Sequence, residues 1–456
     1  MAGIGFELRK LLERDSLSGI LQAYVYASVI ASGPWVLSII GILVIGILSS
    51  AVGGAGLMVT QFQVSVTYLI TASLILTGFV QLSFTRFIAD RLYENAEAIV
   101  LPNFNGVTLM VTVVSGSLGL AAIAFLFPEQ NLVYRLLMLT GFVLLSNIWV
   151  ATIFLSGLKQ YKQIVLLYAL GYGVTVSASL SLRPLGLEGL LLGFVLGHGV
   201  MLLGMVVLVV RSFPAKTFIA FDFARRGAMF GSLILVGFLY NLAVWLDKIL
   251  FWFWPTTGQQ VIGPLRASVI YDLPIFLAYL SILPGMAVFL VRMETDFVEY
   301  YQKFYSAVRG GSTLARLEDL RNDMVYTIRR GLFEIIKIQT IAVLAVFVAG
   351  PALLKALGIP QLYLPLLYID VVAAGLQVVL LGLMNVFFYL DKRHIVLCLV
   401  ALFAVLNGLF TWATLHLGAA WFGYGFALAV FITVFIAFQV LDRKLETLEY
   451  ETFMLQ

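Results

Sequence analysis

The 456-residue sequence contains little charge, because Asp, Glu, Lys and Arg together make up 11% of it, against about a quarter in soluble domains. It has a single cysteine, Cys398, so no disulfide can form within the chain. The three histidines, His198, His394 and His416, are far apart in the sequence, which disfavours a histidine-based metal site. The composition excludes an ordinary soluble domain.

Motifs of enzymes that act on nucleotides or sugars are also missing. There is no GxxxxGK[ST] and no Gly-Lys pair, so the chain lacks a Walker-type phosphate loop. HExxH, Asp-x-Asp and Gln-x-x-Arg-Trp do not occur either. We therefore expect a protein that is not an enzyme, with no catalytic residues, no cofactor and no metal.

Long apolar runs dominate what is present: 61% of the residues are hydrophobic and the mean hydropathy is +1.02. Because a transmembrane helix needs about 20 apolar residues, these runs predict an all-α integral membrane protein with twelve transmembrane helices. Breaks are expected at Gly33-Pro34, Pro274 and Pro284. The predicted spans are residues 20–48, 62–85, 106–127, 132–156, 163–182, 186–210, 227–253, 262–291, 332–354, 362–390, 394–416 and 420–441.

Positive charge is distributed unevenly between the two sides of this twelve-span arrangement. Of the 28 Lys and Arg residues, 22 fall in connections on one side, while only Arg183 and Lys355 fall on the other. Cytoplasmic loops carry such an excess, so both termini are predicted to be cytoplasmic. The formal net charge of +4 then reflects orientation and not binding of nucleic acid.

A charged break divides the spans into two sets of six. The segment RSFPAKTFIAFDFARR at 211–226 predicts a cytoplasmic inter-lobe linker. The other predicted divisions are a cytoplasmic amphipathic helix at 1–19, a first six-helix lobe at 20–210, a second at 227–441, and a cytoplasmic tail at 442–456.

The one long connection, 292–331, is charged but carries apolar residues at helical spacing. One register comprises Phe297, Tyr300, Tyr301, Phe304 and Val308, and a second comprises Leu317, Leu320 and Met324. Two interpretations stay open: a docking surface for a cytosolic partner, or a pair of helices resting on lipid headgroups.

The seventh span has the largest concentration of polar residues. Tyr240 and Asp247, and likewise Asn241 and Lys248, are seven residues apart, so the four predict one polar strip along the helix. Polar groups inside a membrane usually face a partner or a water-filled cavity. Because adjacent residues point about 100° apart on a helix, Asp247 and Lys248 are expected to be poor partners for each other.

The next span begins with two more charges, Arg266 and Asp272. We hypothesise that Asp247, Lys248, Arg266 and Asp272 line the outer half of a central cavity through which substrate passes. The alternative is that Asp247–Arg266 and Lys248–Asp272 ion pairs only fasten spans seven and eight together.

Four further residues inside spans are substrate-pathway or relay candidates, each with a simpler alternative. Arg135 can line the pathway or snorkel to the interface, whereas Asp370 lies deeper and favours a pathway role. Trp35 can stack on a sugar ring or fill the kink beside it. His198 can relay protons or form a packing hydrogen bond.

Three segments carry a resemblance to a known family: the opening MAGIGFELRKLL, SGPW at 32–35, and LDKILFW at 246–252. Within a frame of twelve spans they resemble the PelG family, the inner-membrane transport components of Pel exopolysaccharide export. That family is similar to the polysaccharide transporter branch of the multidrug/oligosaccharidyl-lipid/polysaccharide exporter superfamily. An Asp followed by a cation late in span seven is shared more loosely among related flippases.

The resemblance implies a flippase-like fold in the bacterial inner membrane, with two six-helix lobes around a central cavity and alternating access. It also implies an N-acetylhexosamine-rich cargo that moves from cytoplasm to periplasm. Expected partners are membrane lipids, a cytosolic glycosyltransferase, a cyclic-di-GMP receptor subunit and a further membrane subunit.

Other functions remain open at this stage. One is a lipid-linked oligosaccharide flippase or small-molecule exporter of the same fold, and another is a non-transporting scaffold for a polysaccharide synthase. A scaffold predicts tolerance of neutral substitutions at Asp247 and Arg266, whereas transport predicts loss of export with the complex intact.

Overall fold

The computed structural model describes residues 24, 27, 37–42, 44–46, 48, 56–157 and 161–454. Within this part of the chain, eleven helices are long and apolar enough to cross a membrane, and each coincides with one of the predicted spans from 62–85 onward. The prediction of an all-α membrane protein is confirmed. The predicted helix 1–19, the Gly33-Pro34 break and most of the predicted span 20–48 lie outside the described residues.

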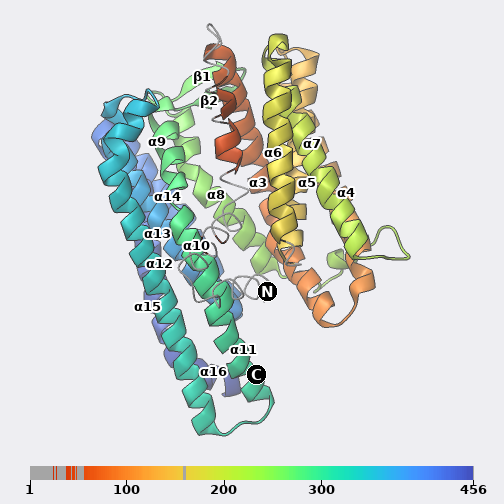
Figure 1. Cartoon of the computed structure of the whole chain (residues 1–456), viewed down its shortest axis with the longest axis vertical. Coiled ribbons are helices and arrows are strands. Elements are labelled where there is room, and N and C mark those ends of the chain that lie inside the picture. Colours follow the sequence, from red (N-terminus) through yellow and green to blue (C-terminus); the bar gives the residue numbers. More distant parts are fainter. Residues whose placement is uncertain are drawn as a thin grey trace. The chain divides into compact units, whose positions relative to one another are not determined.

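The described helices group into two compact units (Figure 1). The N-terminal unit is Gly33–Val269, and the C-terminal unit takes in Ile270–Gln456. The long helices of the first are α3 (Gly56–Tyr93), α4 (Val100–Leu126), α5 (Leu132–Gly157), α6 (Tyr161–Leu182), α7 (Leu187–Ser212) and α8 (Gly231–Phe253). Those of the second are α9 (Val269–Leu280), α10 (Leu283–Val291), α11 (Val298–Arg309), α12 (Leu314–Ala356), α13 (Leu364–Tyr389), α14 (Arg393–Leu417), α15 (Tyr424–Glu446) and α16 (Leu448–Met454).

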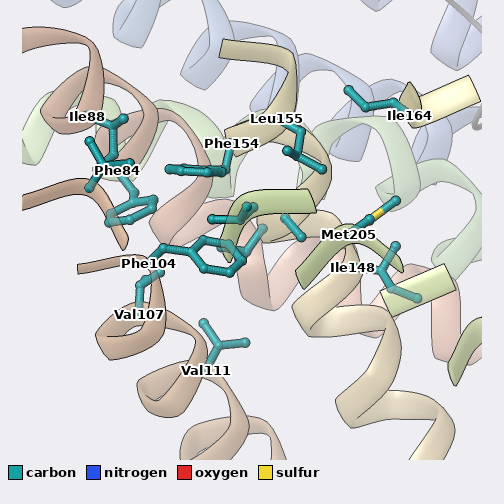
Figure 2. Close-up of a cluster of buried hydrophobic side chains, with 14 of the residues drawn as sticks. Phe84, Ile88, Phe104, Val107, Val111, Ile148, Phe154, Leu155, Ile164 and Met205 are labelled. Carbon is teal, nitrogen blue, oxygen red and sulfur yellow. The ribbon is translucent and has the colours of Figure 1, made fainter. Parts of the chain in front are cut away.

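A cluster of aromatic side chains forms one core of the N-terminal unit, near the end of α3 and the start of α4 (Figure 2). Phe84, Phe104 and Phe154 come from three different helices, and each is about 1% exposed. The ring centroids of Phe104 and Phe154 are 4.8 Å apart, and those of Phe84 and Phe154 are 6.1 Å apart. Such ring pairs add attraction beyond the burial of apolar area, so they hold the three helices together.

The boundary between the two units differs from the predicted linker at 211–226. The helix α8, which the sequence placed in the second lobe, packs on α3 in the N-terminal unit. Two glycines allow this close crossing: a Cβ added to Gly237 would lie 2.2 Å from the carbonyl oxygen of Gly78, and one added to Gly78 would lie 2.6 Å from that of Gly237. Small residues of this kind let membrane helices approach each other closely.

The region of the eighth predicted span contains a feature that the apolar pattern did not indicate. A β-hairpin of β1 (Gln259–Ile262) and β2 (Leu265–Ala267) precedes the helices, so the helical part begins at Val269 and not at 262. Of the two expected proline breaks, Pro284 lies in the first turn of α10, where the chain does break. Pro274 lies inside α9 and does not end it.

The long connection 292–331 folds as two helices, as its spacing predicted. The helix α10 passes through a π-helical turn, Arg292–Phe297, into α11, and α12 then runs as one helix of 43 residues into its membrane span. In the first register, Phe297 and Phe304 are 0% exposed, and Tyr300, Tyr301 and Val308 are half-buried. The second register, Leu317, Leu320 and Met324, is buried, so the chain itself covers most of these apolar faces.

Candidate functional site

The two charged members of the α8 polar strip, Asp247 and Lys248, are fully buried within the N-terminal unit. Asp247 is 0% and Lys248 1% exposed, although both lie on a helix that is otherwise almost entirely apolar. The Lys248 ammonium donates to both carboxylate oxygens of Asp247, at 3.1 and 3.2 Å, and to the carbonyl oxygen of Val244 at 2.9 Å. It also lies 5.9 Å from the ring centroid of Trp245.

The expectation that Asp247 and Lys248 are poor partners is therefore wrong. Although their Cα–Cβ bonds diverge, the long stem of Lys248 bends back along the helix toward Val244 and returns the ammonium to the carboxylate. Removal of both groups from water is expensive, so a pair with additional hydrogen bonds is strongly preferred over two separate charges. Loss of either partner would leave one buried charge uncompensated.

Arg266 has a structural role that the sequence did not indicate. Its Nε donates to the carbonyl oxygen of Trp252 at 3.1 Å, and its Nη2 donates to that of Gly258 at 2.8 Å. These carbonyls lie at the end of α8 and just beyond it, where helical carbonyls have no partner within the helix. The guanidinium thus caps α8, and its hydrogen bonds go to carbonyls and not to Asp247.

Tyr68 of α3 completes this capping cluster. Its hydroxyl donates to the carbonyl oxygen of Arg266 at 2.9 Å and accepts from the backbone N–H of the same residue at 3.2 Å. Its ring stacks on Trp252 with centroids 4.6 Å apart. Sequence reasoning identified neither Tyr68 nor Trp252 as part of this cluster. The pairing could not be found from the sequence, because 198 residues separate Tyr68 from Arg266.

The other two members of the strip, Tyr240 and Asn241, lie nearer the start of α8 and are half-buried. Asn241 donates from Nδ2 to the carbonyl oxygen of Gly237 at 3.0 Å, next to the glycine crossing with α3. Tyr240 is its neighbour on the same helix. Both are accessible enough to meet a ligand, unlike the Asp247–Lys248 pair.

The two acidic candidates in the C-terminal unit have different environments. Asp370 of α13 is 0% exposed and lies close to the start of α15, where a Cβ added to Gly423 would come within 3.1 Å of its Oδ1. Asp272 of α9 is half-buried.

The remaining candidates lie apart from the α8 pair. Arg135 is half-buried in the first turn of α5, a position from which it can reach the interface. His198 is 1% exposed, its Nδ1 lies 2.8 Å from the carbonyl oxygen of Phe194, and its ring is 3.8 Å from that of Phe194. These contacts are typical of a packed histidine. Trp35 lies outside the described residues.

A third buried acid was missed because it lies in the segment assigned to the cytoplasmic connection. Glu294, in the π-helical turn, is 9% exposed. It accepts hydrogen bonds from Asn385 Nδ2 at 3.1 Å and from the Tyr389 hydroxyl at 2.9 Å. These bonds join the turn to α13.

Comparison with known protein families decides the assignment. The model of one family, described as "PelG: Putative exopolysaccharide Exporter (EPS-E)", matches residues 1–453. The chain belongs to the PelG family. The match covers almost the whole chain, so it includes both units and the segment that carries the α8 pair. A search of curated proteins found no match.

Solved structures similar to this PelG family member are transporters. An outward-facing multidrug resistance MATE family transporter of the MOP superfamily has a TM-score of 0.66 at 16% identity, over 94% of this chain and 96% of that one. A MATE in the straight conformation gives 0.65 at 16%, with the same coverage. A MOP superfamily transporter from Pyrococcus furiosus gives 0.64 at 14%, over 93% and 96%. At these identities the likeness shows the fold, which is that of a multi-pass membrane transporter.

Proposed function

We propose that this protein moves an N-acetylhexosamine-rich exopolysaccharide, Pel, from the cytoplasm to the periplasm across the bacterial inner membrane. The observation that carries the proposal is the PelG family match over residues 1–453, joined to a transporter fold. The charge distribution supports an orientation with both termini in the cytoplasm. The two units, with α8 in the N-terminal one, would alternate access to a central pathway.

We further propose that the polar residues within the spans form this pathway. A neutral sugar polymer is recognised by hydrogen-bonding groups and aromatic rings. Tyr240 and Asn241 offer such groups from half-buried positions. The Asp247–Lys248 pair is net neutral and is tied to the backbone of α8, so it would shape the pathway without attracting ions of one sign.

Secretion assays on three variants test this proposal. Asp247→Asn removes the carboxylate charge beside Lys248, whereas the double variant Asp247→Leu/Lys248→Met removes both charges at similar volume. Gln259→Ala, on the exposed edge of β1, is the matched control. Secreted and cytoplasm-retained polymer are measured together with protein level and co-purification of partners.

Transport through this site predicts that both α8 variants lose secretion while the protein and its complex persist. If only Asp247→Asn loses secretion and the apolar double variant restores it, the pair is structural and the pathway proposal for these residues fails. Normal secretion in all variants would favour the scaffold. Loss of drug resistance with normal polymer secretion would favour a small-molecule exporter.

We also propose that a cytosolic glycosyltransferase docks on the α11–α12 hairpin or on residues 1–19, beside a cyclic-di-GMP receptor subunit and a further membrane subunit. The hairpin must use its outer face, where Leu314 and Tyr326 are 62% and 65% exposed. Leu314→Glu/Tyr326→Glu should then reduce co-purification of the glycosyltransferase. Leu362→Glu, at an exposed position on the opposite side of the membrane, is the control. Equal co-purification of both variants would rule out this face of the hairpin.

A further inference from the structure

The connection between α7 and α8 carries an exposed apolar tip. Phe218, Ile219 and Phe221 lie close together in the sequence, and they are 78%, 41% and 48% exposed. This connection leaves α7 at the right-hand edge of Figure 1, in yellow-green. A cluster of large apolar side chains at a surface marks a place that another apolar phase covers.

Cations surround this tip. Lys216, Arg225 and Arg226 are all exposed. The one acid within 213–230 is Asp222, and it pairs with Arg225 at 2.8 Å. The segment therefore keeps a net positive charge, which complements an anionic surface.

The base of the connection is held firmly on α4. Asn103 Oδ1 accepts from the backbone N–H of Asp222 at 2.8 Å, and Asn103 Nδ2 donates to the Asp222 carboxylate at 3.0 Å. Asn105 Nδ2 donates to the carbonyl oxygen of Phe218 at 2.8 Å. Phe223 is 3% exposed and enters the aromatic core, with its ring 5.7 Å from that of Phe84.

A further backbone hydrogen bond fixes where the tip lies along α4. The N–H of Ala220 donates to the carbonyl oxygen of Pro102 at 2.9 Å, and Gly106 leaves room for Ala220, whose oxygen would be 2.0 Å from an added Cβ. At 1.5 Å per residue, residues 102–106 are about 3–9 Å from the start of α4. The tip thus lies beside the first two turns of α4, a helix long and apolar enough to cross a membrane.

We propose that residues 216–226 form an anchor for anionic lipid. Phe218, Ile219 and Phe221 insert at the boundary between headgroups and acyl chains of the cytoplasmic leaflet, and Lys216 and Arg226 bind lipid phosphates. Interfacial elements bury their apolar side chains about 5–10 Å into this boundary. The hydrogen bonds to α4 fix the tip before it meets lipid, so little conformational entropy is lost on insertion.

Nitroxide depth measurements on the full chain in nanodiscs test the insertion. Cys398→Ala removes the one native thiol, and spin labels are then placed by Phe218→Cys or Phe221→Cys. Ser312→Cys, in the exposed turn between α11 and α12, is the control. Labels at 218 and 221 should collide more with oxygen than with a water-soluble nickel complex, and the label at 312 should show the reverse. Equal nickel accessibility at all three sites would overturn the anchor, as would shielding that appears only when a soluble partner protein is added.

Lipid specificity is tested with paired charge variants. Thermal stabilisation of the purified protein by phosphatidylglycerol is compared with that by phosphatidylcholine. Each cation near an anionic surface strengthens binding about fivefold, so Lys216→Gln/Arg226→Gln should weaken apparent phosphatidylglycerol binding about thirtyfold. Arg309→Gln/Arg316→Gln, on exposed positions of the α11–α12 hairpin, should leave it unchanged. Equal binding by both variants would overturn the anionic-lipid assignment.

Discussion

At the scale of single residues, the buried charges show how much geometry the sequence leaves open. The polar positions of α8 could be found because charges are rare in apolar runs. Their partners could not, because a lysine stem reaches back a full helical turn and because Arg266 bonds to carbonyls that no sequence pattern marks. The candidate residues were therefore predictable, and their pairing was not.

We predict that the Arg266 cap contributes substantially to the stability of the N-terminal unit. Hydrogen bonds from a charged group contribute about 1.5–3 kcal/mol each, and Arg266 donates two of them to carbonyl oxygens. Arg266→Gln should lower the melting temperature of the purified protein by several degrees, and Arg266→Lys should lower it less.

Tyr68→Phe separates the stability contributed by the hydrogen bonds of Tyr68 from that contributed by its stacked ring. It removes both hydrogen bonds to Arg266 but keeps the ring stacked on Trp252, so its effect should be smaller than that of Arg266→Gln. Gln259→Ala in the same hairpin should leave the melting temperature unchanged. Equal melting temperatures for all of these variants and the unmodified protein would contradict the capping role.

At the scale of elements, the spans were predictable and their grouping was not. Apolar runs of about 20 residues identify membrane helices by physical necessity. The apolar pattern did not predict the short β-hairpin, because its residues fall between a polar turn and an apolar run. The packing of α8 on α3 depends on two glycines far apart in the sequence, and glycine is frequent throughout these spans.

We predict that the α3–α8 crossing tolerates no side chain. Gly237→Ala would place a methyl group against the Gly78 carbonyl, and overpacking of this kind costs about 1–3 kcal/mol. Gly116→Ala on α4 is the control, because nothing lies within 4 Å of its added Cβ. Thermal unfolding in the same detergent should show a loss for Gly237→Ala alone. Equal stability of the two variants would mean that the helices do not cross at these glycines.

The C-terminal helix α16 provides a pH-dependent contact. Burial raises the pKa of Glu451, but hydrogen bonds and charges from Lys392 and Lys444 lower it more, so the net pKa lies below its usual value of 4.5. A carboxylate with a lowered folded-state pKa stabilises the docked helix fully above its unfolded pKa. That contribution is lost as the pH falls through the folded-state value.

A spin label at Phe453→Cys in the Cys398→Ala background reports this docking. The label should be immobilised at pH 7 and become mobile as the pH falls below about 4.5. Glu451→Gln should make it more mobile at pH 7 and remove most of the pH dependence. A label whose mobility does not change with pH in the parent would contradict the role of Glu451.

At the scale of the whole molecule, the family match and the fold both indicate a transporter. The solved structures reported above nevertheless share little sequence with this chain. The PelG match covers residues 1–453, while the MATE structures share about one residue in six. The sequence segments that carry the family resemblance include the buried α8 pair. The pair therefore lies both in a segment that resembles the family and in the buried interior of the N-terminal unit.

The most direct test of polysaccharide transport is a protection assay in inside-out membrane vesicles that contain this protein and its glycosyltransferase. Labelled nucleotide sugar is added outside, and the polymer that survives an added glycosidase is measured. We predict that protected polymer accumulates inside the vesicles and that Asp247→Leu/Lys248→Met reduces it severalfold while synthesis continues. Polymer that is made but stays fully sensitive to the glycosidase would contradict transport by this protein.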